Sequence, residues 1–183
     1  MIRSGEAVTI CVKGLLIFVL AQLILGLPAT GAFAADSNKQ FWSGLFGSEN
    51  KAPAPDFELK DLQGTPVRLS KFKGEKPVLL YFWATWCPYC IQAKPKIALV
   101  QQKMGEKEMQ VFGINVGEGD TIEKLRRYQE GHPVAWPILY DDGGQVSRTY
   151  RVQGIPLFVL VDKDGSIVYR GNEVPDNPAK YLK

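Results

Sequence analysis

A short, continuously apolar run is the strongest hydrophobic feature in the middle of the chain. Residues 77–84 read Pro-Val-Leu-Leu-Tyr-Phe-Trp-Ala and carry no charge. Such a run is typical of a strand that is buried on both faces of a sheet. The following segment, 91–104, has a different pattern, because Ile97, Val100 and Met104 recur at helical spacing. We therefore predict a buried strand that leads into a helix.

The rest of the pattern predicts a sheet protein with interspersed helices. A turn-rich loop at 61–65 lies between two short apolar segments and predicts a β-hairpin. Asp120 and Glu123 have the spacing of a helix-capping box, and an apolar stripe follows them. Further strands are expected at 109–116, 136–140, 157–162 and 166–171. A further short helix is expected at 145–150. The predicted order is β-β-β-α-β-α-β-α-β-β with a short tail.

Residues 1–34 have the pattern of an export signal. Arg3 and Lys13 supply positive charge, and the apolar stretch 14–27 is too short for a comfortable membrane span. Ala32-Phe33-Ala34 matches a small-x-small cleavage site. An uncleaved membrane anchor is the alternative for this segment. Cys11 precedes the apolar stretch, so it does not have the position of a lipid-modified cysteine.

Without the signal, 149 of the 183 residues remain, enough for one domain with its own core. We expect a flexible lead-in over 35–52, rich in turn-forming residues, and one domain over 53–183. Removing Arg3, Lys13 and Glu6 leaves 20 basic and 18 acidic residues. This balance does not favour nucleic acid or a membrane surface as a partner.

Cys87 and Cys90 lie where the predicted strand meets the predicted helix. Cys87 should precede the helix, Pro88 suits its first position, and Cys90 should lie in its first turn. Unpaired N–H groups and the helix dipole favour an anion there, which would be the reactive thiolate. A zinc site would need two more ligands, and a structural disulfide would close only a very short loop. Reversible redox chemistry is therefore the preferred reading.

Several motifs together resemble the TlpA/ResA-like branch of exported, thioredoxin-family thiol–disulfide oxidoreductases. The resemblance extends over about residues 53–172. The residues that carry it are Ala54–Leu59, Gly64, Val67, Leu69, Phe82–Cys87, Cys90, Pro95, Asn115–Glu118, Gly154–Pro156, Phe158 and Asp162–Gly165. The resemblance implies an α/β thioredoxin fold: a central mixed β-sheet flanked by helices. It also implies an N-terminal β-hairpin and a helix–strand insertion at about 120–140.

The resemblance also implies roles for individual residues. Cys87 and Cys90 would be the catalytic pair that alternates between dithiol and disulfide. Pro156 would follow a cis peptide bond and face this pair, and the main chain of Ile155 would pair with an extended substrate segment. Trp86 would lie beside Cys87 on the rim. We also place Pro88 and Tyr89, the two residues between the cysteines, at the substrate-binding surface.

The sequence departs from the family pattern in two ways. Tyr81 and Ala93 occupy the two positions where relatives carry an acid that can take the proton of the second cysteine. Glu118 is the remaining acid suggested by the motifs as an acid/base group. The dipeptide Pro88-Tyr89 is glutaredoxin-like, and it does not by itself set the reduction potential.

We therefore expect an exported enzyme that mainly reduces protein disulfides, with apocytochrome c as one candidate substrate. Electrons would come from a membrane-embedded thiol donor. No flavin or nicotinamide cofactor is expected, because no Gly-rich dinucleotide motif accompanies a βαβ unit, and no metal is expected, because the cysteine pair lacks two further ligands. The protein would act as a monomer in the bacterial periplasm or on the outer face of the cytoplasmic membrane. A disulfide oxidant or isomerase on the same scaffold is the alternative. A peroxiredoxin-like peroxidase is disfavoured because the Pro-x-x-x-Thr-x-x-Cys signature is missing, and a non-catalytic binding module because both cysteines are intact.

Overall fold

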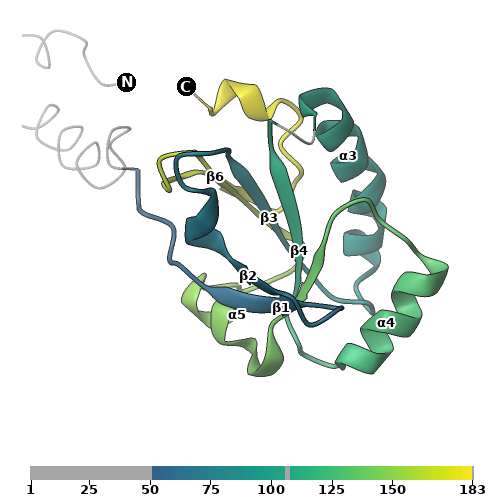
Figure 1. Ribbon diagram of the computed structural model, residues 1–183. Helices are drawn as coiled ribbons and strands as arrows, with labels where there is room; N and C mark the ends of the chain where they lie inside the picture. Colours follow the sequence, from purple (N-terminus) through teal and green to yellow (C-terminus); the bar gives the residue numbers. More distant parts are fainter. Residues whose placement is uncertain (1–50, 106–107, 183) are drawn as a thin grey trace, which may run out of the picture. The chain divides into compact units, whose positions relative to one another are not determined.

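A computed structural model describes residues 51–105 and 108–182, which form one mixed sheet with helices on both faces (Figure 1). The sheet has seven strands in the order β2-β1-β5-β4-β3-β6-β7. The strands are β1 (Glu58–Asp61), β2 (Pro66–Arg68), β3 (Val78–Trp83), β4 (Gln110–Asn115), β5 (Ile138–Tyr140), β6 (Leu157–Val161) and β7 (Ile167–Gly171). The α-helices are α3 (Pro88–Met104), α4 (Ile122–Gly131) and α5 (Gln145–Thr149). Single 3₁₀ turns occur at Leu69–Phe72, Asp142–Gly144 and Pro178–Lys180.

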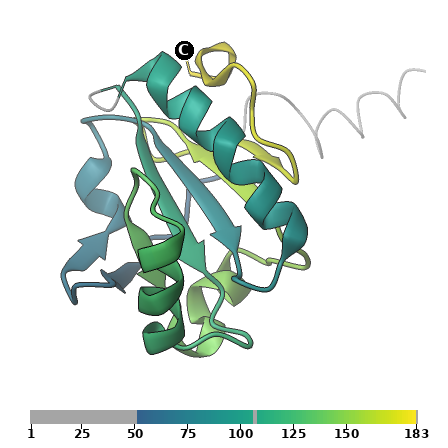
Figure 2. The ribbon, with the colours of Figure 1, turned by 90° about the vertical axis from the view of Figure 1, so that its right-hand side faces the viewer.

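Strand β3 is the centre of this sheet. All six of its residues are buried, as expected for the apolar run, and it pairs in parallel with β4 and antiparallel with β6. Because β3, β4 and β5 run parallel and are joined through α3 and α4, both helices lie on one face of the sheet. Helix α5 lies on the other face (Figure 2). The order of elements predicted from the sequence is confirmed.

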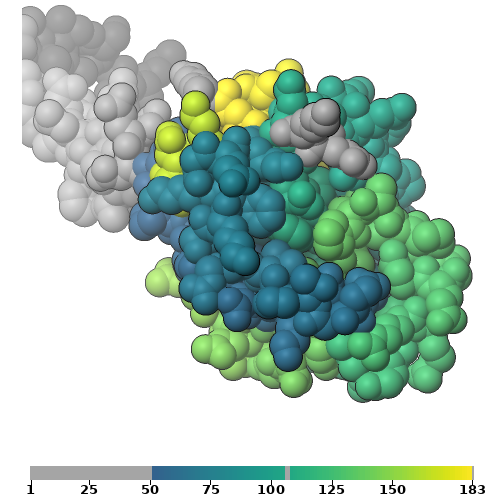
Figure 3. Space-filling view, in the orientation of Figure 1, coloured from purple at the N-terminus to yellow at the C-terminus, as the bar shows by residue number. Residues whose placement is uncertain are grey.

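The predicted N-terminal hairpin is also present. Strands β1 and β2 pair antiparallel, and β1 joins the main sheet through β5. In the space-filling view the segment from β1 to the first 3₁₀ turn forms much of the near surface (Figure 3). Just before this segment, Lys51 and Ala52 contact the region where β6 turns into β7. The Lys51 amine forms an ion pair with Asp162 at 2.8 Å, and the Ala52 carbonyl accepts a hydrogen bond from the main-chain N–H of Ile167.

One helix boundary differs from the prediction. Thr121, and not Asp120, is the N-cap of α4, and its side chain accepts a hydrogen bond from the main-chain N–H of Lys124. Asp120 is instead buried and turned towards the loop that precedes α3. Of the predicted stripe, Leu125 is fully buried, while Ile122 and Tyr128 are partly buried against the core.

Other expectations concern segments that the structure does not describe. The signal or anchor at 1–34 and the lead-in as far as residue 50 lie outside the described residues. Within 51–105 and 108–182, no helix is long and apolar enough to cross a membrane. In the same two segments, no three His, Cys, Asp or Glu side chains are grouped to hold a metal ion.

Candidate active site

The N-terminus of α3 carries both cysteines. Cys87 is the N-cap residue and Pro88 occupies the first helical position, as the sequence predicted. The structure joins Cys87 and Cys90 by a disulfide bond, and the main-chain N–H of Cys90 donates to Cys87 Sγ at 3.2 Å. A sulfur in this position receives hydrogen bonds from the helix N-terminus, which favour its thiolate form once the pair is reduced.

The surface around the pair is unevenly exposed. Cys87 is 3% exposed to solvent and Cys90 is not exposed at all, whereas Tyr89 is 72% exposed. Pro88 is exposed beside it. The predicted Pro88-Tyr89 surface therefore lies next to two cysteine residues that are almost fully buried.

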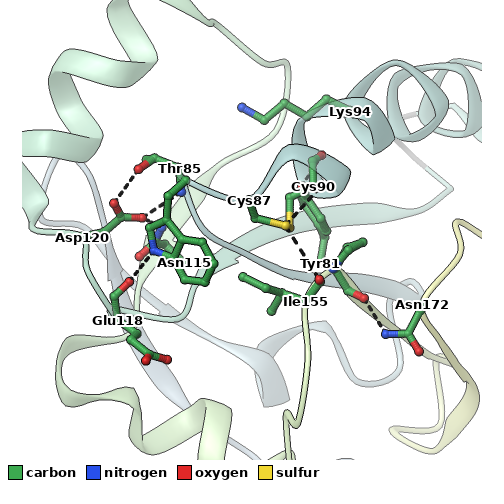
Figure 4. The surroundings of a disulfide bond; sticks show 12 residues. Tyr81, Thr85, Cys87, Cys90, Lys94, Asn115, Glu118, Asp120, Ile155 and Asn172 are labelled. Atoms are coloured by element: carbon green, nitrogen blue, oxygen red, sulfur yellow. Dashed lines mark hydrogen bonds between the residues drawn. A yellow bond between two sulfur atoms is a disulfide. The ribbon is translucent and has the colours of Figure 1, made fainter.

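The loop before β6 lies against Cys87. The Ile155–Pro156 peptide bond is cis, as the resemblance implied, and Cys87 Sγ lies 3.7 Å from the carbonyl oxygen of Ile155 (Figure 4). On the other side of this loop, the Asn172 side-chain amide donates to the carbonyl of Pro156 at 2.8 Å. The structure thus brings Ile155 and Pro156, nearly seventy residues further along the chain, to the cysteine pair.

A groove of about 670 Å³ opens beside this loop. Trp86 and Ile155 line the end near Cys87, and Gly143 and Arg148 lie further along it. Trp86 is 52% exposed, and its indole N–H donates to the main-chain carbonyl of Glu118 at 2.8 Å. An exposed aromatic side chain on the rim of a groove is a frequent anchor in protein recognition.

Comparison with known proteins agrees with this arrangement. The model of the AhpC/TSA family matches residues 51–170. A thiol-disulfide oxidoreductase ResA from Bacillus cereus is 32% identical over 171 residues, which cover 90% of this chain and 95% of the relative. The chain belongs to the AhpC/TSA family and is a ResA-like thiol–disulfide oxidoreductase. The Cys87–Cys90 disulfide fits the redox pair of such an enzyme.

Solved structures confirm the predicted thioredoxin fold. The ResA-like chain is similar to a putative thiol:disulfide interchange protein DsbE from Chlorobium tepidum, with a TM-score of 0.60 and 32% identity over 72% of this chain and 89% of the other. It is also similar to the thioredoxin domain of a thiol-disulfide oxidoreductase from Bacteroides vulgatus. That match has a TM-score of 0.64 and 27% identity, and it covers 73% of this chain and 97% of the other.

Glu118 reaches the site of this ResA-like enzyme through its main chain. Its main-chain carbonyl accepts a hydrogen bond from the indole N–H of Trp86. Its side-chain carboxylate is exposed and directed away from the sulfur atoms (Figure 4). The acid/base role expected for Glu118 stays a prediction. The contact that the structure does show, between the Glu118 carbonyl and Trp86, positions the residue before Cys87 against the loop that follows β4.

Asp120 is the acid that the sequence reasoning did not assign to the site. Its carboxylate accepts hydrogen bonds from the main-chain N–H and the hydroxyl of Thr85, at 2.8 and 2.5 Å, and from the amide of Asn115 at 2.7 Å. Lys124 pairs with it at 2.7 Å. Burial alone would raise the pKa of Asp120, but the hydrogen bonds from Lys124, Thr85 and Asn115 outweigh burial and hold this pKa below its usual value. Asp120 therefore stays ionised and fixes the loop that enters the redox helix.

Lys94 lies one helical turn after Cys90 and is partly buried. Its amine sits 4.4 Å from the ring centre of Trp83 and 4.5 Å from that of Tyr128, and it donates to the Tyr128 hydroxyl at 3.3 Å. Burial lowers the pKa of Lys94 to about 8. The spacing of four residues from Cys90 was the one available signal for a lysine on this side of α3.

Proposed function

We propose that the protein is an exported reductant of protein disulfides in which Cys87 attacks the substrate and Cys90 resolves the intermediate. One observation carries this assignment of roles. Of the two cysteines, Cys87 is the residue at the helix N-terminus that retains some exposure, and its Sγ lies beside the Ile155 carbonyl at the end of the groove. Cys90 is fully covered and can meet a partner's sulfur only through Cys87.

The chemistry is two successive thiol–disulfide exchanges. The Cys87 thiolate attacks one sulfur of the substrate disulfide, and the other substrate sulfur leaves as a thiolate. Cys90, as its thiolate, then attacks Cys87, so that the mixed disulfide breaks and the second substrate sulfur leaves. Two electrons have passed from the enzyme to the substrate, and the enzyme is left with its Cys87–Cys90 disulfide.

Substrate binding uses the surface around Cys87. We assign the main chain of Ile155 to pairing with an extended substrate segment, because its carbonyl faces the sulfur that such a segment must reach. Trp86, Pro88 and Tyr89 form an exposed rim next to Cys87. In this proposal Pro156 shapes the loop that presents Ile155, and Asn172 holds that loop from behind.

The partners follow from the chemistry and the expected export. A membrane-embedded thiol donor would return the pair to the dithiol, and the enzyme would act as a monomer in the periplasm or at the outer face of the cytoplasmic membrane. The substrate would be an exported protein whose thiol pair must stay reduced. Apocytochrome c is the first to test, because haem attachment at Cys-x-x-Cys-His needs both thiols.

Trapping of the mixed disulfide tests the two roles. The probe is an oxidised peptide that contains Cys-x-x-Cys-His, and the chain carries Cys11→Ala so that only the site thiols react. Cys90→Ser should accumulate a stable mixed disulfide through Cys87, because the resolving sulfur is gone. Cys87→Ser should accumulate far less. Equal trapping by the two variants, measured by non-reducing gel and mass spectrometry, would show that the roles are wrongly assigned.

A further inference from the structure

Tyr81 lies in β3, directly beneath the first turn of the redox helix. Its hydroxyl donates to the carbonyl oxygen of Cys90 at 2.7 Å, and the residue is fully buried (Figure 4). The ring stacks between Trp83 and Phe158, with ring centres 6.1 and 5.1 Å away and planes within 14° and 8° of parallel. Because both sides of the ring are packed, the hydroxyl has one position available.

Cys90 is consequently held through both of its own main-chain polar groups. Its N–H donates to Cys87 Sγ at 3.2 Å, and its carbonyl accepts from Tyr81. With the main chain fixed from both sides, the Cys90 sulfur can move relative to Cys87 only by rotation about its side-chain bond.

The Tyr81 hydroxyl remains a donor throughout the accessible pH range. Burial raises the pKa of Tyr81 far above its usual value, and the nearby Tyr128 adds to the rise. A hydroxyl that does not ionise can hold the carbonyl of Cys90, but it cannot take the proton of the Cys90 thiol. Its contribution is therefore one of position and not of proton transfer.

We propose that Tyr81 is a positioning residue for the resolving step: its hydroxyl holds the first turn of α3 so that Cys90 Sγ meets Cys87 Sγ. The proposal rests on the dithiol chemistry proposed above. In this step the Cys90 thiol gives its proton to water, and its sulfur forms the bond to Cys87. The bond from Cys87 to the partner's sulfur breaks, and the electron pair leaves on the partner's thiolate.

A chromogenic aromatic disulfide separates the two steps. When the reduced full chain carrying Cys11→Ala reacts with dithiobis-nitrobenzoate, attack by Cys87 releases the first nitrothiolate and resolution by Cys90 releases the second. Tyr81→Phe keeps the stacked ring and removes only the hydroxyl. It should slow the second release by about fivefold, the rate equivalent of one ordinary hydrogen bond, and leave the first release unchanged.

Tyr150→Phe is the matched control. Tyr150 is also buried, and its hydroxyl also donates to a main-chain carbonyl, that of Pro55 at 2.6 Å, but it packs against Phe82 on the other side of β3. This variant should lose a similar amount of stability and keep both release rates. Equal slowing of both releases in Tyr81→Phe, no slowing, or the same split in Tyr150→Phe would overturn the proposal.

Two further measurements do not depend on Tyr81→Phe. Para-aminophenylalanine at position 81 retains a donor and should keep the second release close to the wild-type rate. In the reduced wild-type protein, infrared spectroscopy of an isotope-labelled Cys90 carbonyl should show the shift of a hydrogen-bonded group, and an unshifted band would refute the proposal. Both use the protein without a physiological substrate, so the result is independent of whether the protein reduces exported proteins.

Discussion

The carboxylate of Asp120 shows how one buried charge can organise a redox site without touching a sulfur atom. Burial opposes its ionisation, but donors from three separate parts of the chain, Thr85, Asn115 and Lys124, converge on it. The same region holds Trp86 through the carbonyl of Glu118. Asp120 therefore determines the path of the chain from β3 into Cys87.

Replacement of Asp120 by Asn should destabilise the protein in a pH-dependent way. At pH 7 we expect a loss of roughly 2 kcal/mol in the free energy of unfolding, because charge-assisted hydrogen bonds in a buried site are lost. The pKa of Asp120 is lower in the folded protein than in the unfolded chain. Its stabilisation is therefore complete above the unfolded pKa of about 3.9 and is lost as pH falls through the folded value. Urea unfolding of both proteins between neutral and acidic pH measures the difference.

Asp61→Asn is the control for this experiment. Asp61 accepts hydrogen bonds from the main chain of Gln63 and Thr65 in an exposed turn, and an asparagine side chain can accept the same bonds. We expect little change in stability and none in the alkylation rate of Cys87, whereas Asp120→Asn should alter both. An Asp120→Asn deficit that stays constant down to acidic pH would contradict the argument.

At the scale of elements, local patterns were sufficient for the order of strands and helices, while the thioredoxin fold was implied by the family resemblance. The uncharged run of β3, the helical spacing in α3 and the turn at Asp162–Gly165 are encoded within short windows. The start of α4 was misplaced because Asp120 and Thr121 are both good capping residues. The choice between them depends on the hydrogen bond from Thr85 to Asp120. These two residues are thirty-five positions apart, so a short stretch of sequence around α4 cannot reveal the contact.

For the site, too, the local features were predictable from the sequence and the long-range contacts were not. The cysteine pair and its place at a helix N-terminus follow from a motif and its flanking pattern. The hydrogen bond from Trp86 to Glu118 and that from Tyr81 to Cys90 depend on how β3, β4 and α3 are packed. Such long-range contacts become visible only once the sheet order is known.

The groove is lined by Trp86, by the loops that precede α4 and β6, and by α5 with the turn before it, so its rim can be tested separately from the chemistry. Trp86→Ala should raise the KM for a protein disulfide by about tenfold, the cost of a moderate interface anchor, because the exposed indole is lost. The rate with a small disulfide reagent should change much less, since such a reagent does not need the groove. Steady-state kinetics with both substrates give the comparison.

Leu99→Ala is the matched variant for Trp86→Ala. Leu99 is 55% exposed on α3, the helix that follows Trp86, more than two turns beyond Cys90, and does not line the groove. It should leave both rates unchanged. An equal loss with the small reagent in Trp86→Ala would mean that the indole supports Cys87 itself and not the partner.

At the scale of the whole molecule, the property to predict is the direction of electron transfer between the enzyme and its partners. The chain has a formal net charge of +3 and one histidine. That histidine, His132, stacks on Tyr128 at the end of α4, with ring centres 4.3 Å apart. The support that the structure shows for a Cys87 thiolate is the helix N-terminus, through the N–H of Cys90. This support is weaker than the combination of a helix terminus with an adjacent cation.

A weakly stabilised thiolate means a weakly stabilised reduced form, and hence a more reducing couple. We therefore predict a reduction potential well below the roughly −120 mV of the strong oxidant DsbA, close to the range of about −200 to −270 mV that glutaredoxins and thioredoxin span. Tyr89→His introduces a cation-forming residue two positions from Cys87 and should raise the potential, while Tyr89→Phe should not. Equilibration of each protein against glutathione or dithiothreitol buffers, followed by alkylation, gives the values. A wild-type potential near that of DsbA would instead favour a protein that oxidises its partners.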